Sequence, residues 1–296
     1  MCPLVTVTLG ARATSSAWSS DARSQGAEIE PARIAYASCP LCGDAAILDL
    51  LEADCTRHPL YQPALPTRIG WCRCHGCGHV FAEGYFNQAA EALLFASTPP
   101  GQEPGEDVER QRALWAGVVE RVSAHLDAAP QRAGAAPGRW LDVGFGNGSL
   151  IFTAAEWGYR TLGIDLRASS VAKLQALGFE ARRCDLLELR QPSAFQVVSL
   201  ADVIEHIAFP RQTLEHAATL LAPQGLLFLS TPNIDTAVWR ALDAQGANPY
   251  WGELEHYHCF SRARLYALLR ECGFEPIHYD VSPRYRCGMD VIARTR

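Results

Sequence analysis

The sequence predicts an α/β protein built on a doubly wound, mostly parallel sheet, preceded by a small metal-binding module. Three observations lead to this prediction. From residue 140 onward, apolar strand-like runs alternate with amphipathic helical runs; the last two strand-like runs lie too close together for a crossover; and two cysteine pairs lie between residues 39 and 77. A length of 296 residues suits one large domain with a small module added.

The alternating region follows an amphipathic helix, because apolar residues recur at helical spacing from Val108 to Leu126. The runs RWLDVGF, RTLGIDL, FQVVSLA and LLFLSTPN then read as strands, with helical runs between them. Repeated βα units give a parallel sheet with helices on both faces. About seven residues, SPRYRCG, join the runs FEPIHYDV and GMDVIARTR, so the last strand must run antiparallel.

The cysteine pairs predict a zinc site. Eleven cysteines without a convincing secretory signal argue against a disulfide framework. Cys39 and Cys42 form one Cys-x2-Cys pair and Cys74 and Cys77 form another, so each pair brings two thiolates onto one tight turn. Four thiolates leave no open coordination position, which favours a structural Zn²⁺ over a catalytic one. The alternative is a set of unrelated free cysteines.

Composition and charge give the expected organisation. We expect a flexible tail at 1–34, a zinc-ribbon-like module at 35–97, a Pro- and Gly-rich linker at 98–106, and the sheet domain at 107–296. A net charge of −6 argues against a nucleic-acid partner. Nothing approaches the roughly 20 apolar residues of a membrane span, so we expect no membrane insertion and a cytoplasmic location. The oligomeric state stays open.

The expected ligand site lies beyond the carboxyl ends of the strands. The first strand ends in DVGFGNG, residues 142–148, whose glycines lie two apart rather than in the spacing typical of dinucleotide binding. Asp165 ends the second strand 21 residues after Gly144, where a carboxylate can accept both hydroxyls of a ribose. Asp185 ends the third strand, near the expected position of an adenine edge.

Five motifs in this order resemble class I S-adenosylmethionine (SAM)-dependent methyltransferases over about 107–296: LDVGFGNGSL, GIDL, CDLLEL, and the two within FQVVSLADVIEHI and LLAPQGLLFLSTPN. The resemblance implies a Rossmann-like sheet of seven strands and SAM as the cofactor. Glycines would let the backbone approach the methionine moiety, and Asp142 would hold its ammonium group. The cofactor-binding residues it implies are Asp142, Gly144, Gly146, Gly148, Asp165, Asp185, Leu200 and Asp202.

The stretch SLADVIEHI allows three interpretations. Asp202, Glu205 and His206 could hold a divalent metal ion, for which two carboxylates and an imidazole suit Mn²⁺ or Zn²⁺ better than Mg²⁺. Glu205 and His206 could instead act as acid and base or contact the substrate. All three side chains could simply cap a helix.

The methyl acceptor is predicted less sharply. The stretch ELEHYHCFSRARLYALLRECGFEP is similar to that of ubiquinone-pathway O-methyltransferases, which implies a small-molecule acceptor methylated at a hydroxyl oxygen. His256 and His258 are candidate bases, although a loop histidine is more often structural. We expect residues 233–258 to cap the acceptor pocket through their aromatic side chains, Trp239, Tyr250, Trp251 and Tyr257.

The sequence also allows other functions. A sugar C- or N-methyltransferase also pairs a zinc module with this fold, and an rRNA base methyltransferase is a more distant alternative. The net negative charge and the sequence EHI at 205–207 argue against the rRNA base methyltransferases. A protein that binds SAM without catalysis and uses the ribbon to dock a partner is a different class altogether.

Overall fold

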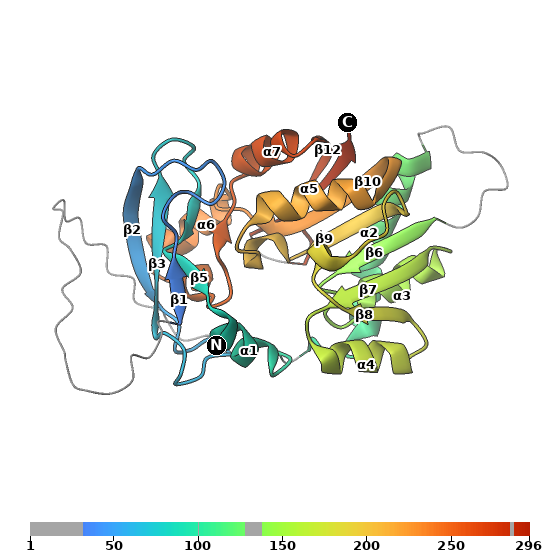
Figure 1. Ribbon diagram of the computed structural model, residues 1–296, viewed down its shortest axis with the longest axis horizontal. Helices are drawn as coiled ribbons and strands as arrows, with labels where there is room; N and C mark the ends of the chain where they lie inside the picture. Colours follow the sequence, from blue (N-terminus) through green and yellow to red (C-terminus); the bar gives the residue numbers. More distant parts are fainter. Residues whose placement is uncertain (1–31, 100, 128–137, 285–286) are drawn as a thin grey trace.

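The computed structural model describes residues 32–99, 101–127, 138–284 and 287–296. The predicted flexible tail falls mostly outside these residues, but its last positions, Arg33 and Ile34, belong to a short strand. Two bodies lie side by side: a small β-rich module and a larger α/β domain, with one short helix between them (Figure 1). Among the described residues, no helix is both long enough and apolar enough to cross a bilayer.

The α/β domain contains the predicted seven-stranded sheet. In spatial order its strands are β12 (Phe274–Val281), β13 (Gly288–Thr295), β10 (Leu221–Pro232), β9 (Phe195–Ala201), β6 (Arg139–Val143), β7 (Arg160–Asp165) and β8 (Glu180–Arg183). Strand β13 is antiparallel to both neighbours, and the remaining pairs are parallel. The structure therefore confirms the prediction of an antiparallel last strand.

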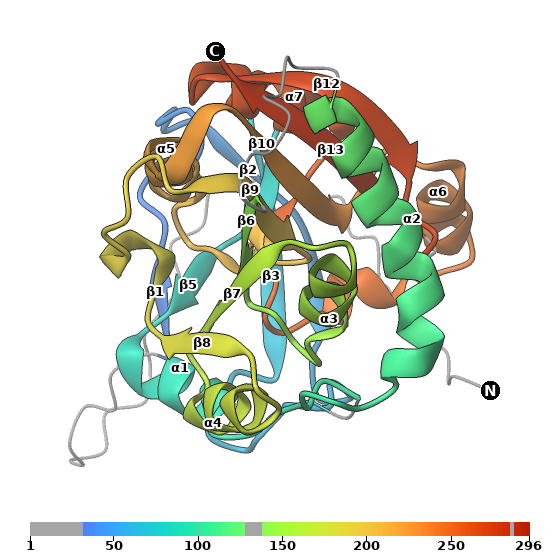
Figure 2. The same ribbon diagram turned by 90° about the vertical axis from the view of Figure 1, so that its right-hand side faces the viewer.

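Helices cover both faces of this sheet, as alternating strands and helices require. One face packs against α2 (Val108–Asp127) and α3 (Ser149–Glu156), and α4 (Ala168–Ala176) joins α3 beside β8. The other face packs against α5 (Pro210–Leu220) and α7 (Arg262–Glu271). Figure 2 shows α2 and α3 on one side of the strands and α5 on the other.

The module is built on a second sheet of four strands. Its order is β11 (His258–Cys259), β4 (Val80–Ala82), β3 (Arg68–Cys74) and β2 (Ile47–Asp54), while β1 (Arg33–Ala35) pairs with β5 (Gly84–Phe86). Strand β11 comes from the chain that follows β10 of the large domain, so the two bodies share a sheet. Helix α1 (Gln88–Phe95) ends the module and is capped by Asn87, whose side chain accepts from the Ala90 amide.

The aromatic residues of 233–258 correct one expectation. Trp239, on α6 (Ala237–Ala244), and Trp251, on a 3₁₀ turn (Pro249–Gly252), are buried in the module core rather than around the pocket. The Trp71 indole packs edge-on against Trp251 and donates to its carbonyl oxygen at 2.9 Å. Tyr250 stacks on Trp239. Burying these aromatic side chains in the core of the small module stabilises the fold more than placing them at a partly exposed ligand site would.

Candidate active site

A cavity of about 340 Å³ lies at the carboxyl ends of the central strands, a size suited to a small-molecule ligand. The strand ends of β6, β7, β8 and β9 form its floor. Its other walls come from α1 and the residues that follow it, from α2, from the segment before β11 and from Arg284. Tyr257, alone among the four aromatic residues expected at the acceptor pocket, is part of its lining.

The glycine loop gives this floor an open backbone. Gly144, Gly146 and Gly148 have φ angles of 62°, 52° and 77°, in the left-handed region that favours glycine. A Cβ atom on Gly146 would lie 2.5 Å from Oε1 of Gln102, and one on Gly144 would lie 2.9 Å from the Val203 side chain. Side chains at these two positions would therefore collide with neighbours that border the cavity.

Three carboxyl groups at successive strand ends line the same cavity: Asp142 on β6, Asp165 on β7 and Asp185 after β8. Asp142 is 3% exposed and accepts from the Ser199 hydroxyl at 2.5 Å, and burial raises its pKa to about 7. Burial also raises the pKa of Asp165, which accepts from the Arg167 amide at 2.7 Å.

This row of carboxyl groups matches the donors of SAM. They can accept from an ammonium group, a ribose diol and an adenine amine in turn, and the glycine loop leaves room for the methionine moiety. The residues present therefore fit the cofactor.

Of the last two residues that the resemblance implies, Asp202 borders the cavity and Leu200 does not. Leu200 is fully buried in the sheet core, and the next residue, Ala201, borders the cavity instead. Asp202 has a left-handed φ of 56° and pairs with Arg284, whose guanidinium lies 2.7 Å from Oδ2. The Ser230 hydroxyl donates to its other oxygen, so both carboxylate oxygens are engaged.

Of Asp202, Glu205 and His206, the structure groups the last two with His256 rather than with Asp202. The group with metal-capable atoms within 4.8 Å of one another is Glu205, His206 and His256. Glu205 is 1% exposed; burial raises its pKa well above the usual range, and the nearby charge of Asp202 raises it further. A carboxyl group that binds its proton more tightly is a poorer metal ligand, because that proton must first be displaced.

His206 is the member of this group that lines the cavity. Its Nδ1 lies 3.1 Å from the carbonyl oxygen of Glu255. Because a carbonyl only accepts, Nδ1 carries the hydrogen, and the neutral ring keeps a lone pair on Nε2. The His256 ring packs edge-on against it at 4.7 Å, and burial lowers the pKa of His256 to about 3, which keeps it neutral.

His258 is not placed to act as the base that its sequence position suggested. Both ring nitrogens are engaged: Nε2 lies 2.9 Å from the Ile207 carbonyl oxygen, and Nδ1 lies 3.0 Å from Nε2 of His79. The side chain is fully buried on β11, where it joins the module to the loop after β9. A histidine with both nitrogens satisfied in a closed interior is structural.

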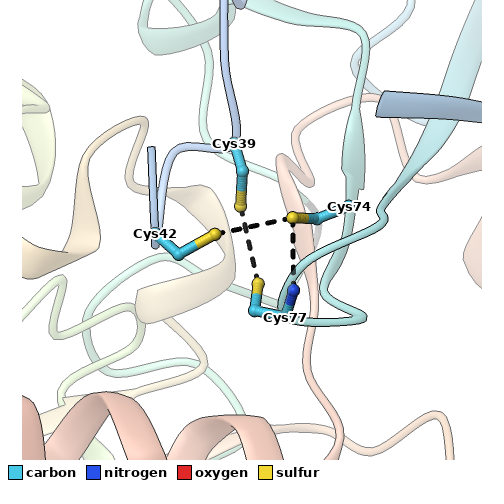
Figure 3. A group of neighbouring side chains, drawn as sticks. All are labelled: Cys39, Cys42, Cys74 and Cys77. Carbon is cyan, nitrogen blue, oxygen red and sulfur yellow. Dashed lines mark hydrogen bonds between the residues drawn. The ribbon is translucent and has the colours of Figure 1, made fainter. Parts of the chain in front are cut away.

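The four predicted zinc ligands converge at one end of the module (Figure 3). The Sγ atoms of Cys39 and Cys77 are 3.7 Å apart, and those of Cys42 and Cys74 are 3.5 Å apart. Tetrahedral Zn²⁺ with bonds of about 2.3 Å places its sulfur ligands roughly 3.8 Å apart. The sulfur arrangement therefore fits this ion.

Several lining residues carry no signal that would single them out in the sequence. Arg284 lies in the loop between β12 and β13 and reaches a carboxylate 82 positions away. Glu91 and Phe95 lie on α1, and Gln102 lies in the expected linker. Helical spacing and the Asn87 cap could have indicated α1 itself, but not what it faces.

Comparisons with known proteins agree with this geometry. Residues 108–279, more than half of the chain, match a family described as methyltransferase domain. The ubiquinone biosynthesis O-methyltransferase of Xanthomonas euvesicatoria pv. vesicatoria is 34% identical over 171 residues, which cover 53% of this chain and 68% of that protein. The enzyme of the same name from Burkholderia multivorans is 32% identical over 138 residues, covering 44% and 54%.

A solved structure supports the fold alone. The 1,6-didemethyltoxoflavin-N1-methyltransferase of Burkholderia thailandensis, with 1,6-didemethyltoxoflavin and S-adenosylhomocysteine bound, aligns over 75% of this chain and 97% of its own, with a TM-score of 0.53 and 20% identity. Sheet order, the glycine loop with its row of carboxyl groups, and the family match lead to one conclusion: this chain belongs to the methyltransferase-domain family and is a SAM-dependent methyltransferase.

Proposed function

We propose that this enzyme methylates a hydroxyl oxygen of a small-molecule acceptor and that His206 accepts the hydroxyl proton. The observation that carries the proposal is the hydrogen bond from Nδ1 of His206, a residue of the cavity wall, to the Glu255 carbonyl, which leaves Nε2 as the acceptor atom of the ring. The names of the two relatives, ubiquinone biosynthesis O-methyltransferases, support oxygen as the methylated atom.

Residues at different strand ends would bind different parts of SAM. The glycine loop and Asp142 would hold the methionine end of SAM, Asp165 the ribose and Asp185 the adenine edge. SAM supplies an electrophilic methyl group on a sulfonium. His206 would take the proton as the acceptor oxygen bonds to that methyl carbon, and the carbon–sulfur bond breaks to release S-adenosylhomocysteine. In-line alignment of oxygen, carbon and sulfur is mainly a matter of positioning.

The acceptor would lie beside His206, between Tyr257 and Ile207. Tyr257 is held by the module, because its main-chain carbonyl accepts from Ala82 and its hydroxyl lies 3.3 Å from the Phe86 amide. Trp115 of α2 and Arg284, whose guanidinium stacks 4.1 Å from the indole, form the far wall. A flat hydroxylated ring suits walls of this kind.

The module is proposed to hold one structural Zn²⁺ through Cys39, Cys42, Cys74 and Cys77. Residues 35–97 would form this module, and 98–106 would join it to the methyltransferase domain at 107–296. The pairing of β11 with β4 and the buried tryptophans support a module that is folded onto the enzyme rather than tethered to it.

The test is turnover with defined acceptors. Phenols, catechols and amines of similar size are incubated with SAM, and products are identified by mass spectrometry with fragmentation. We expect a mass increase of one methylene on oxygen, and His206→Ala should lower its rate by about 10²- to 10⁴-fold while S-adenosylhomocysteine still binds. Methylation confined to nitrogen or carbon, or full turnover by His206→Ala, would contradict the proposal.

A further inference from the structure

Two neighbouring stretches of the N-terminal part, 91–99 and 101–103, border the cofactor cavity through Glu91, Leu94, Phe95, Thr98, Pro99, Gly101 and Gln102. They include the end of α1, and together we call them the cap. The cap lies outside residues 108–279, the part of the chain that matches the methyltransferase-domain family. Its contacts run from the end of β8, past β7, to the glycine loop after β6.

At the β8 end, Glu91 borders the same cavity as Asp185. Both side chains line the cavity, and burial raises the pKa of Glu91, with the charge of Asp185 raising it further. Two carboxyl groups that approach one another at a ligand site are stabilised by a group with two donors between them. The exocyclic amine of adenine is such a group.

Over β7, Arg167 contacts both Phe95 and the residue two positions after it. The Arg167 guanidinium lies 5.2 Å from its ring centroid, and Nε of Arg167 donates to the Ser97 carbonyl at 3.3 Å. The Arg167 amide donates to Asp165, the residue proposed to bind ribose. An aromatic ring tied to that strand end is placed to pack against the flat adenosine moiety.

At the glycine loop, Gln102 lies over Gly146, within 2.5 Å of the position that a Cβ atom would occupy. Asn147 holds this part of the cap by donating to the carbonyl oxygens of Gly101 at 3.4 Å and Glu106 at 3.0 Å. Lys173 of α4 pairs with Glu103. The Gln102 amide can both donate and accept, which suits the amino-acid end of SAM.

We propose that the cap completes the cofactor site, with Glu91 on the adenine amine, Phe95 against the adenosine and Gln102 on the amino-acid end. The four-cysteine module thus contributes residues to the SAM site and does not only pack beside the methyltransferase domain. This inference rests on SAM as the cofactor and not on the acceptor or on His206, because cofactor binding is measured without an acceptor.

The experiment is calorimetric titration of the zinc-loaded full chain with S-adenosylhomocysteine and with 5′-methylthioadenosine, which lacks the amino-acid end. Phe95→Ala should weaken both ligands, each by roughly tenfold, as expected for loss of one aromatic contact to a base. Gln102→Ala should weaken S-adenosylhomocysteine and leave methylthioadenosine unchanged. Glu91→Gln should weaken S-adenosylhomocysteine but not S-inosylhomocysteine, in which a carbonyl replaces the adenine amine.

Gln88→Ala is the matched control, because Gln88 lies on an exposed part of the same helix. It should bind every ligand as the unmodified chain does. Zinc content and melting temperature identify any variant that has lost its fold, and Phe95→Leu, which keeps an apolar side chain there, serves if Phe95→Ala does so. Unchanged affinity in Phe95→Ala or Phe95→Leu with the fold intact would overturn the proposal, as would an equal loss in Gln88→Ala.

Discussion

The Cys39–Cys42–Cys74–Cys77 group and the Glu205–His206–His256 group both bring metal-capable atoms within 4.8 Å of one another, but their surroundings differ. The four thiols come from two tight turns and meet one another. In the second group, His206 is held by a backbone carbonyl, and Glu205 is buried with a raised pKa. Asp202, the carboxylate expected to complete it, is paired with Arg284. The first group is therefore suited to a metal and the second to handling a proton.

The largest expected effect comes from breaking the first group. Cys74→Ser removes one of four thiolates, and because structural zinc contributes on the order of 10 kcal/mol to folding in small zinc modules, the module should unfold. Metal analysis should find one Zn per chain before the change and much less after it. Cys72→Ser is the control, since Cys72 is buried on the same strand outside the group and should leave zinc content unchanged. A metal-free chain that melts at the original temperature would refute the assignment.

The next effect concerns the second group. His206→Ala should lower kcat by about 10²- to 10⁴-fold, the usual contribution of a positioned base, without changing affinity for S-adenosylhomocysteine. His216→Ala is the matched control, because His216 lies on α5, contacts the Leu189 carbonyl and is not itself a lining residue. Equal kcat in the two variants would show that His206 has only a structural role.

The comparison also shows how far the sequence leads. Cys-x2-Cys turns and the glycine loop are local, so spacing alone predicted which atoms would meet. The parallel sheet with an antiparallel last strand followed from alternating elements and one short connection, and the structure confirms it. These predictions need no knowledge of distant partners.

What the sequence missed depends on long-range contacts. Nothing near Asp202 indicates that Arg284 pairs with it, and nothing near His258 indicates that His79 and Ile207 engage both its nitrogens. The sequence around Trp239 and Trp251 favours a position at the pocket, because it gives no sign that these side chains complete the apolar core of the module. Each missed feature joins segments far apart in the chain.

The next expected effect is a pH dependence of stability and of ligand affinity that comes from Asp142. Burial raises its pKa to about 7, so the folded chain binds this proton more tightly than the unfolded chain does. Its contribution to stability is therefore full below the unfolded pKa near 4 and is lost as pH rises through about 7. The ionised form is the one that pairs with an ammonium group, so S-adenosylhomocysteine affinity should rise by up to about tenfold per pH unit below about 7.

Calorimetry from about pH 5.5 to about 8.5 would measure this dependence. Asp142→Asn should bind more weakly at about pH 8 and show no slope near 7. A melting temperature of the ligand-free protein that rises between about pH 6 and 8 in the unmodified chain, relative to Asp142→Asn, would have the wrong sign.

The smallest expected effect comes from Glu205→Gln, and it distinguishes proton handling from metal binding most directly. Because burial and the charge of Asp202 raise the pKa of Glu205 well above its usual range, its protonated form is favoured, and glutamine nearly reproduces the shape and charge of that form. We expect kcat to change by no more than a few-fold and added Mg²⁺ or Mn²⁺ to have no effect on either protein. If Glu205 were a metal ligand, the unmodified enzyme would be activated by one of these ions, and Glu205→Gln would lose both that activation and most of its activity. The assay is performed with zinc retained in the module, by adding ions rather than removing them, so that loss of the four-cysteine site cannot imitate the result.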